Sequence, residues 1–137
     1  MRSLGLDVGD KRIGVALSDP DGILASPLTI INCQNEQTDI AAIVDIIQQN
    51  QVGKIIVGLP LSMNGSMSKQ AEKVQAFTEE LRGCTDIPVE YRDERLSTVS
   101  AKRLMQTVKR VNRETRHDAV AAALVLQGYL DEASFRG

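Results

Sequence analysis

The spacing of apolar residues changes along this chain, and that change limits its fold more than any other feature. Residues 4–8 and 13–17 alternate apolar with small or polar side chains, which is the period of an extended strand. The Gly-Asp turn at residues 9–12 joins the two segments and predicts a β-hairpin. Within residues 40–47 the apolar residues recur every three or four positions, which predicts an amphipathic helix.

Three further strands complete the expected sheet. A strand over residues 23–31 contains Pro27, which lacks an N–H donor, so we expect this strand at an edge or a bulge. Residues 55–57 form a continuous β-branched run, typical of a strand buried on both faces of a parallel sheet. We expect the preceding helix to end at Gly53 and a last strand at residues 88–91.

The remaining segments are predicted to be helical. One helix covers residues 71–81, and another starts with Ser97 or Thr98 as its cap and runs to residue 108. A basic loop over residues 109–116 follows. The last helix runs from Asp118 to about residue 130, and it is apolar on most sides, as expected of a helix that packs against much of the core.

This element order predicts an α/β fold. We expect a mixed five-stranded sheet, three antiparallel strands and then two parallel ones, with helices on both faces. The first strand is rich in glycine and belongs at the sheet centre, antiparallel to the second strand and parallel to residues 55–57. With 137 residues, the whole chain (1–137) is expected to be one domain.

Composition narrows the function classes. Aromatic residues make up 3% of the chain, which argues against a module that stacks bases on aromatic side chains. No apolar run approaches the ~20 residues of a membrane span, and the N-terminus carries Asp7 where a signal peptide would be apolar. Cys33 and Cys84 form no CxxC pair, which excludes a cysteine-based zinc site and favours a reduced, cytoplasmic setting.

The charge is unevenly distributed. The net charge is −2, but residues 102–116 carry six basic side chains and one acidic one, so this run is +5 and the rest of the chain is −7. Such a run is typical either of a solvated helix face and loop or of a patch that meets a phosphate backbone.

Carboxylates collect at one predicted edge of the sheet. Asp7, Asp93 and Glu94 follow or end strands whose carboxyl ends should share that edge, where sites form in open α/β sheets. Asp7 could instead pair with Lys11 or Arg12. Carboxylates held close together repel unless a cation compensates them, so the cluster predicts a Mg²⁺ or Mn²⁺ site.

Other readings of the acidic residues stay open. Asp93 and Glu94 could be surface turn residues tied to Arg92 and Arg95, and Asp118 could be a helix N-cap. His117 is the only histidine and is expected at the surface.

Four motifs in order over nearly the whole chain resemble one family. They are LGLDVGDKRIGVA at residues 4–16, VGLP at 57–60 with NGS at 64–66, DERLST at 93–98, and Asp118 with the AA and LQGYL segments that follow it. The chain resembles the YqgF family, the RuvX-type Holliday junction resolvases. The resemblance implies a ribonuclease-H-like fold, a cytoplasmic bacterial protein, and nuclease action on the 5′ end of precursor 16S ribosomal RNA. His117 departs from the pattern, because an apolar residue is expected there.

The resemblance also implies roles for individual residues. Its acidic positions map onto Asp7, Glu94 and Asp118, which would be the catalytic residues and the ligands of, we expect, two Mg²⁺ or Mn²⁺ ions. The residues expected to bind substrate phosphates are Lys11, Arg12, Gly58, Leu59, Pro60, Asn64, Gly65, Arg95, Thr98, Lys109, Arg110 and Arg113.

Several functions remain open at this point. The first is a metal-dependent nuclease acting on structured RNA, and its close alternative is a resolvase of four-way DNA junctions. The second is a nucleotide-binding phosphotransferase, which would need a second lobe that 137 residues cannot supply. The third is an RNA-binding assembly factor without enzymatic activity. The expected partner is nucleic acid rather than a membrane, and a homodimer is also left open.

Overall fold

A computed structural model describes the backbone of residues 1–94 and 113–135, and the side chains of residues 1–94 and 119–133. Strands and helices alternate along it as the sequence indicates. Their bounds are β1 (Arg2–Val8), β2 (Arg12–Ser18), β3 (Ala25–Asn32), α1 (Glu36–Asn50), β4 (Val52–Leu59), α2 (Lys69–Arg82), β5 (Val89–Asp93) and α4 (Arg113–Phe135). The helix expected over residues 97–108 lies outside the described residues.

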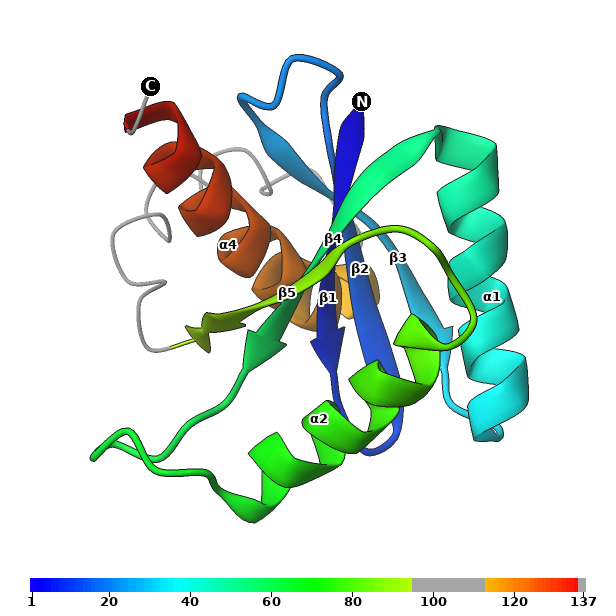
Figure 1. The fold of residues 1–137 in the computed structure, drawn as a ribbon, viewed down its shortest axis with the longest axis vertical. Helices are drawn as coiled ribbons and strands as arrows, with labels where there is room; N and C mark the ends of the chain where they lie inside the picture. The colour runs from blue at the N-terminus through cyan, green and yellow to red at the C-terminus, as the bar shows by residue number, and fades with distance from the viewer. Residues whose placement is uncertain (95–112, 136–137) are drawn as a thin grey trace.

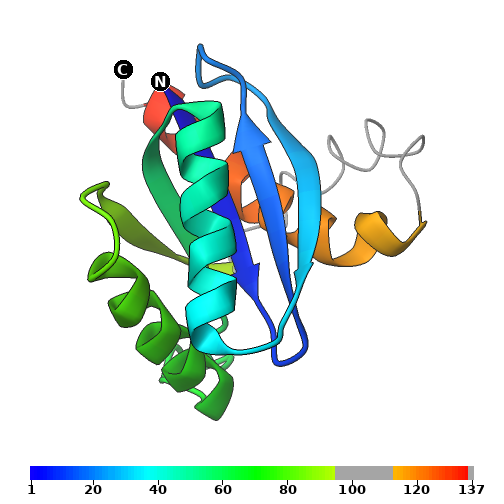
Figure 2. The same cartoon turned by 90° about the vertical axis from the view of Figure 1, so that its right-hand side faces the viewer.

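The five strands form one sheet in the order β3-β2-β1-β4-β5. β1 is central, antiparallel to β2 and parallel to β4, and β5 continues the sheet in parallel. Helices α1 and α2 cover one face and α4 covers the other (Figures 1 and 2). The mixed five-stranded sheet with helices on both faces is thereby confirmed.

The sheet separates two apolar layers. Ile55 and Val57 of β4 belong to the layer under α1 and α2, whereas Ile56 belongs to the layer under α4. All three side chains are fully buried, because successive residues of a strand point to opposite faces. The continuous β-branched run is therefore explained by burial on both sides of the sheet.

Strand β3 is an edge strand of the sheet, as expected from the proline at position 27. Its register with β2 shifts where Val15 pairs with Thr29 and Ala16 pairs with Pro27, so Leu28 is the extra residue of a bulge. A proline is tolerated there because its missing N–H does not interrupt a continuous ladder.

The predicted end of the first helix was wrong. Helix α1 ends at Asn50, and Gln51 takes the left-handed conformation (φ 54°) that closes it, while Gly53 already lies inside β4. The N–H of Gln51 donates to the carbonyl oxygen of Ile47. Glycine is the usual residue for this conformation, so a glutamine there gave no signal in the sequence.

The start of the last helix was also placed too late. Helix α4 begins at Arg113, so residues 113–116 of the expected basic loop are helical. Asp118 lies in the second turn of α4 and is not its N-cap. A charged run carries little information about helix boundaries, since Arg and Glu are good helix formers.

Gln127 joins α4 to the start of β3. Its side chain is buried, its Oε1 accepts from the N–H of Ala25 at 2.8 Å, and its Nε2 donates to the carbonyl of Ile23 at 2.9 Å. We expect Gln127→Ala to lower the free energy of unfolding by about 2 kcal/mol, because two backbone groups lose their partner. Thermal melts of the variant against Gln70→Ala, where a single bond of 3.4 Å is lost, measure this. Equal melting temperatures in the two variants would contradict the expectation.

No helix within the described part of the chain is both long and apolar enough to cross a membrane.

Candidate active site

Asp7 lies near the carboxyl end of the central strand. Asp7 pairs with Gly14 of β2, and the preceding residue, Leu6, pairs with Val57 of β4. The side chain is half-buried, next to fully buried Leu6. An ionised carboxylate in such a place needs a hydrogen-bond partner or a counter-charge.

Glu94 follows β5 directly and reaches over β4. A Cβ atom on Gly58 would lie 2.6 Å from Glu94 Oε1 and 2.9 Å from a methyl group of Val125 in α4. Glycine at position 58 therefore leaves the space that the Glu94 carboxyl group occupies. The Glu94 side chain thus extends from the end of β5 toward β1, which is two strands away in the sheet.

The two carboxyl groups interact directly. Burial, a hydrogen bond to Asp7, and the negative charges of Asp7 and Asp93 raise the pKa of Glu94 from 4.5 to about 8. Near neutral pH the pair thus holds a proton in place of a compensating cation. The convergence of Asp7 and Glu94 at the carboxyl edge of the sheet stays a prediction, and the effect of Asp7 on the pKa of Glu94 agrees with it.

The position of Arg92 does not support the hypothesis that Asp93 and Glu94 are surface turn residues tied to it. The Arg92 side chain is 8% exposed, and its Nη1 donates to Glu132 of α4 at 2.7 Å. Asp93 is the last residue of β5 rather than part of a turn.

Asp118 is placed only through its backbone. It lies on α4, four residues before Ala122, whose carbonyl oxygen would be 2.8 Å from a Cβ on Gly5 of β1. The backbone of Asp118 is therefore about one helical turn from a close contact with the strand that carries Asp7. Its side chain lies outside the described residues, as do Arg95, Thr98, Lys109 and Arg110.

The expected phosphate-binding residues fall into two described segments. Lys11 and Arg12 form the β1–β2 turn, where the Gly9 N–H donates to the Arg12 carbonyl and the Lys11 carbonyl accepts from Cys33. Gly58 and Leu59 end β4, and Pro60, Asn64 and Gly65 lie in the loop that leads to α2. Arg113 opens α4.

The backbone N–H groups of the β4–α2 loop are mostly engaged within it. The Leu61 N–H donates to Leu59, the Gly65 N–H donates to Ser62, and Asn64 Oδ1 accepts from the Ser66 N–H and hydroxyl. Pro60 has no N–H at all. These hydrogen bonds fix the loop shape, and the N–H groups that make them are not available to a substrate phosphate.

The comparison with protein families decides the identity of the chain. The family model described as "RuvX: Holliday junction resolvase" matches residues 1–132. The chain belongs to the RuvX family. A relative from Roseiflexus sp. (strain RS-1), named "Putative pre-16S rRNA nuclease", is 49% identical over 132 residues, 95% of this chain and 94% of its own. A relative of the same name from Desulforamulus reducens is 46% identical over 98% of this chain and 99% of its own.

Solved structures support the same fold at low sequence identity. RuvC of T. thermophilus, in complex with a Holliday junction substrate, has a TM-score of 0.69 and 14% identity, covering 98% of this chain and 96% of that one. The large terminase nuclease of phage G20c has a TM-score of 0.60 and 14% identity, covering 93% and 80%. The RuvX chain thus has the ribonuclease-H-like fold of these resolvases and nucleases.

The acidic pair of this RuvX chain fits a divalent cation. Among the described side chains no three histidine, cysteine, aspartate or glutamate residues converge. Asp7 and Glu94 supply hard carboxylate oxygens, the ligands that Mg²⁺ and Mn²⁺ prefer. Burial first, and then the neighbouring Asp7 and Asp93 carboxyl groups, raise the pKa of Glu94, and a bound cation would oppose that shift.

The acidic pair predicts a pH dependence of stability. Because the folded-state pKa of Glu94 is raised, its contribution to stability is fully present below about pH 4.5 and is lost as the pH rises to about 8. Partial exposure screens the interaction, so we expect Glu94→Gln to be more stable than wild type by only about 1–2 kcal/mol above pH 8 in chelator. Thermal melts on either side of this window measure the difference.

Added Mg²⁺ should offset the loss of stability that we expect at high pH. Above about pH 8, added Mg²⁺ should raise the melting temperature of the wild type and leave Glu94→Gln nearly unchanged. An equal Mg²⁺ effect on both proteins, or a variant that keeps the wild-type pH dependence, would contradict the assignment of the raised pKa to Glu94.

Proposed function

We propose that this RuvX-family nuclease hydrolyses phosphodiester bonds at the 5′ end of precursor 16S ribosomal RNA, with Asp7, Glu94 and Asp118 as its catalytic and metal-binding residues. The observation that carries the proposal is the Glu94 carboxyl group lying over Gly58 of β4, the strand beside the one that carries Asp7. The effect of Asp7 on the pKa of Glu94 supports it. The printed names of relatives at 49% and 46% identity supply the substrate class.

Each carboxylate has a distinct task in this proposal. Asp7 extends from the central strand and is the most rigidly held, since β1 pairs on both sides. Glu94 would hold the cation as a deprotonated carboxylate, which would couple metal binding to pH. Asp118 would complete the ligand set from α4. When bound, Mg²⁺ or Mn²⁺ supplies activation of water and stabilisation of the leaving oxygen.

The substrate would approach along the same edge of the sheet. Lys11 in the β1–β2 turn and Arg12 at the start of β2 lie three and four residues beyond the end of the strand that carries Asp7. Together with Arg95, Lys109, Arg110 and Arg113 they would neutralise phosphates on both sides of the cleaved bond. Such contacts fix position without reading sequence, so specificity would depend on RNA shape.

A second substrate class is favoured by one observation. The family description names Holliday junctions, and the RuvC structure with a TM-score of 0.69 holds a Holliday junction substrate. A chain that resolves four-way DNA must cut two strands at symmetric positions, which generally requires two active sites and hence a dimer.

Side-by-side cleavage assays separate the two substrates. The purified chain is incubated with Mn²⁺ and either a 5′-extended 16S precursor fragment or a four-way DNA junction of similar length. We expect cleavage of the RNA at a discrete position in the 5′ extension, abolished by Asp7→Asn. Preferential, symmetric cutting of the junction would favour the resolvase, and no cleavage of either substrate by folded protein would overturn the proposed nuclease site.

A further inference from the structure

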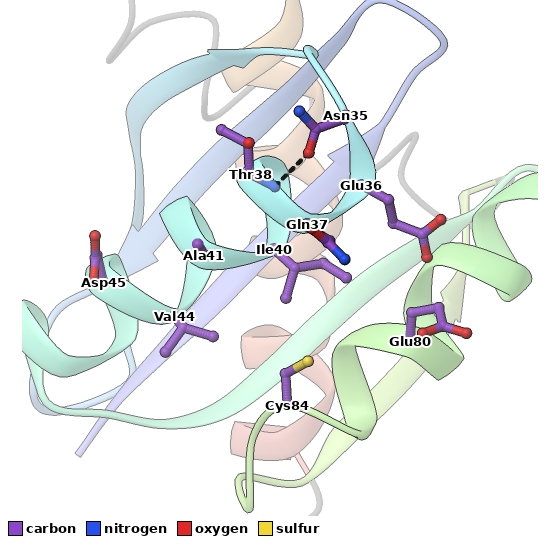
Figure 3. A pocket seen from close by; sticks show the side chains of 10 residues that line it. All are labelled: Asn35, Glu36, Gln37, Thr38, Ile40, Ala41, Val44, Asp45, Glu80 and Cys84. Atoms are coloured by element: carbon purple, nitrogen blue, oxygen red, sulfur yellow. Dashed lines mark hydrogen bonds between the residues drawn. The ribbon is translucent and has the colours of Figure 1, made fainter.

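A large groove lies between helices α1 and α2, away from the acidic pair. Its volume is about 990 Å³, and it is lined by the first three turns of α1, by Glu80 of α2 and by Cys84 just beyond the end of α2. Figure 3 shows these residues from close by, with Glu80 and Cys84 facing the side chains of α1. None of its lining residues belongs to the candidate active site.

The floor of the groove is apolar. Ile40 and Ala41 lie about one turn before Val44 along α1, and Cys84 closes the floor from the other side (Figure 3). Ala41 and Cys84 are exposed, and Val44 is half-buried. An apolar stripe at positions i, i+1 and i+4, walled by a second helix, has the form that accepts an amphipathic helix.

The rim of the groove is acidic. Glu36, Asp45 and Glu80 line it, and no Lys or Arg does. Within the described residues, none of these three carboxylates forms an ion pair. The carbonyl end of α2, which closes with Gly83 immediately before Cys84, adds a partial negative charge to the same place.

The negative charge extends beyond the groove itself. From residue 13 to residue 53 the sequence has no Lys or Arg and has five acidic residues. This stretch includes β3 and all of α1. A phosphate backbone would be repelled by such a surface, whereas a basic protein segment would be attracted to it.

We propose that the α1–α2 groove docks a basic amphipathic helix of a protein partner. Its apolar side chains would lie on the accessible part of the floor, Ala41, Val44 and Cys84, since Ile40 is only 6% exposed, and its Lys or Arg residues would reach the acidic rim. Glu36 and Asp45 are nine residues apart on α1, about 13 Å along the helix axis, so the basic residues of the ligand should recur about every two to three turns. This docking does not depend on the nuclease chemistry.

A designed peptide tests the groove directly. The probe is a fluorescein-labelled 14-residue helix with leucine on one face and lysine on the other, and its partner probe carries glutamate in place of lysine. Binding to the whole chain is followed by fluorescence anisotropy, and the contact surface is mapped by amide chemical-shift changes. The test variant is the double change Asp45→Lys and Glu80→Lys. The matched control is Glu72→Lys, an exposed acidic residue of α2 that does not line the groove.

We expect the lysine peptide to bind the wild type and to shift amides of α1 and the end of α2. The double variant should bind at least about tenfold more weakly, and the control should change less than about twofold. Nuclease activity and melting temperature should stay close to wild type in all variants.

Four results would overturn the proposal. They are no binding of the lysine peptide, equal binding by the double variant, equal binding of the glutamate peptide, and groove shifts caused by single-stranded RNA or by self-association of the chain.

Discussion

Asp7→Asn should reduce metal-dependent cleavage by about three orders of magnitude, or about 4 kcal/mol of transition-state stabilisation. The change keeps the side-chain shape and removes one charge from the pair with Glu94. The fold should survive, because the amide oxygen of the asparagine can still accept the hydrogen bond of the protonated Glu94 carboxyl group. A melting temperature close to that of the wild type is therefore expected in the absence of metal.

Asp10→Asn is the matched control for this prediction. Asp10 is an exposed carboxylate three residues away whose side chain contacts Lys73 Nζ at 3.4 Å on the surface. Such a pair contributes little to stability, so both activity and melting temperature should stay near wild type. Cleavage and melting are measured on the same preparations. If Asp7→Asn melts much earlier yet cleaves at the wild-type rate when folded, Asp7 is half of a structural pair and not a metal ligand.

The second large effect is expected at Gly5, where α4 crosses the central strand. A Cβ atom there would lie 2.8 Å from the carbonyl oxygen of Ala122 and 2.8 Å from Leu126 Cβ. Neither atom is the end of a flexible side chain, so the helix must move away as a unit. We expect Gly5→Ala to lower the free energy of unfolding by about 3 kcal/mol and the melting temperature by about 10 °C.

Gly83→Ala separates this steric effect from the general cost of replacing glycine. Gly83 closes α2 with φ −70°, and a Cβ there would lie 3.4 Å from the Glu80 carbonyl oxygen. Alanine adopts this conformation readily, so stability should change by less than about 0.5 kcal/mol. Circular dichroism melts of both variants give the comparison. A Gly5→Ala protein as stable as Gly83→Ala would mean that α4 does not press on β1 as the structure has it.

Gly5→Ala should also lower activity, because it would displace α4 relative to the strand that carries Asp7. Helix α4 carries the backbone of Asp118, and Asp7 extends from the strand that α4 contacts. A shift of the helix by a fraction of an ångström would separate residues that we propose to share cations. The loss of cleavage should therefore persist at temperatures where the variant is fully folded.

Much of the sheet was predictable because its signals are local. The alternation of residues 4–8 and 13–17, the β-branched run around Ile56 and the proline at position 27 each report on one strand and its exposure. Strand order follows from these signals and from the short connections between elements. Asp7 stood out for the same reason, since a carboxylate inside an apolar strand is costly without a partner.

The geometry of the site was not accessible in this way. Gly58 was predicted to bind a substrate phosphate, and only the structure shows that a Cβ atom at this position would lie 2.6 Å from Glu94 Oε1. Glu94 stood beside Arg92 and Arg95 in the sequence, and only the folded chain brings it to Asp7 and sends Arg92 to Glu132 instead. These contacts join residues of different strands and helices, which no local pattern records.

The sequence by itself therefore determined the element types, the central place of β1 and the carboxylates available for chemistry. Local periodicity and backbone preference are sufficient for those features. Only the tertiary structure decided which carboxylates meet, why glycine is required at positions 5 and 58, and that an acidic groove remains between α1 and α2. The reason is physical: the protonation of a carboxyl group and the clearance around a Cβ atom depend on atoms that are distant in the chain and adjacent only after folding.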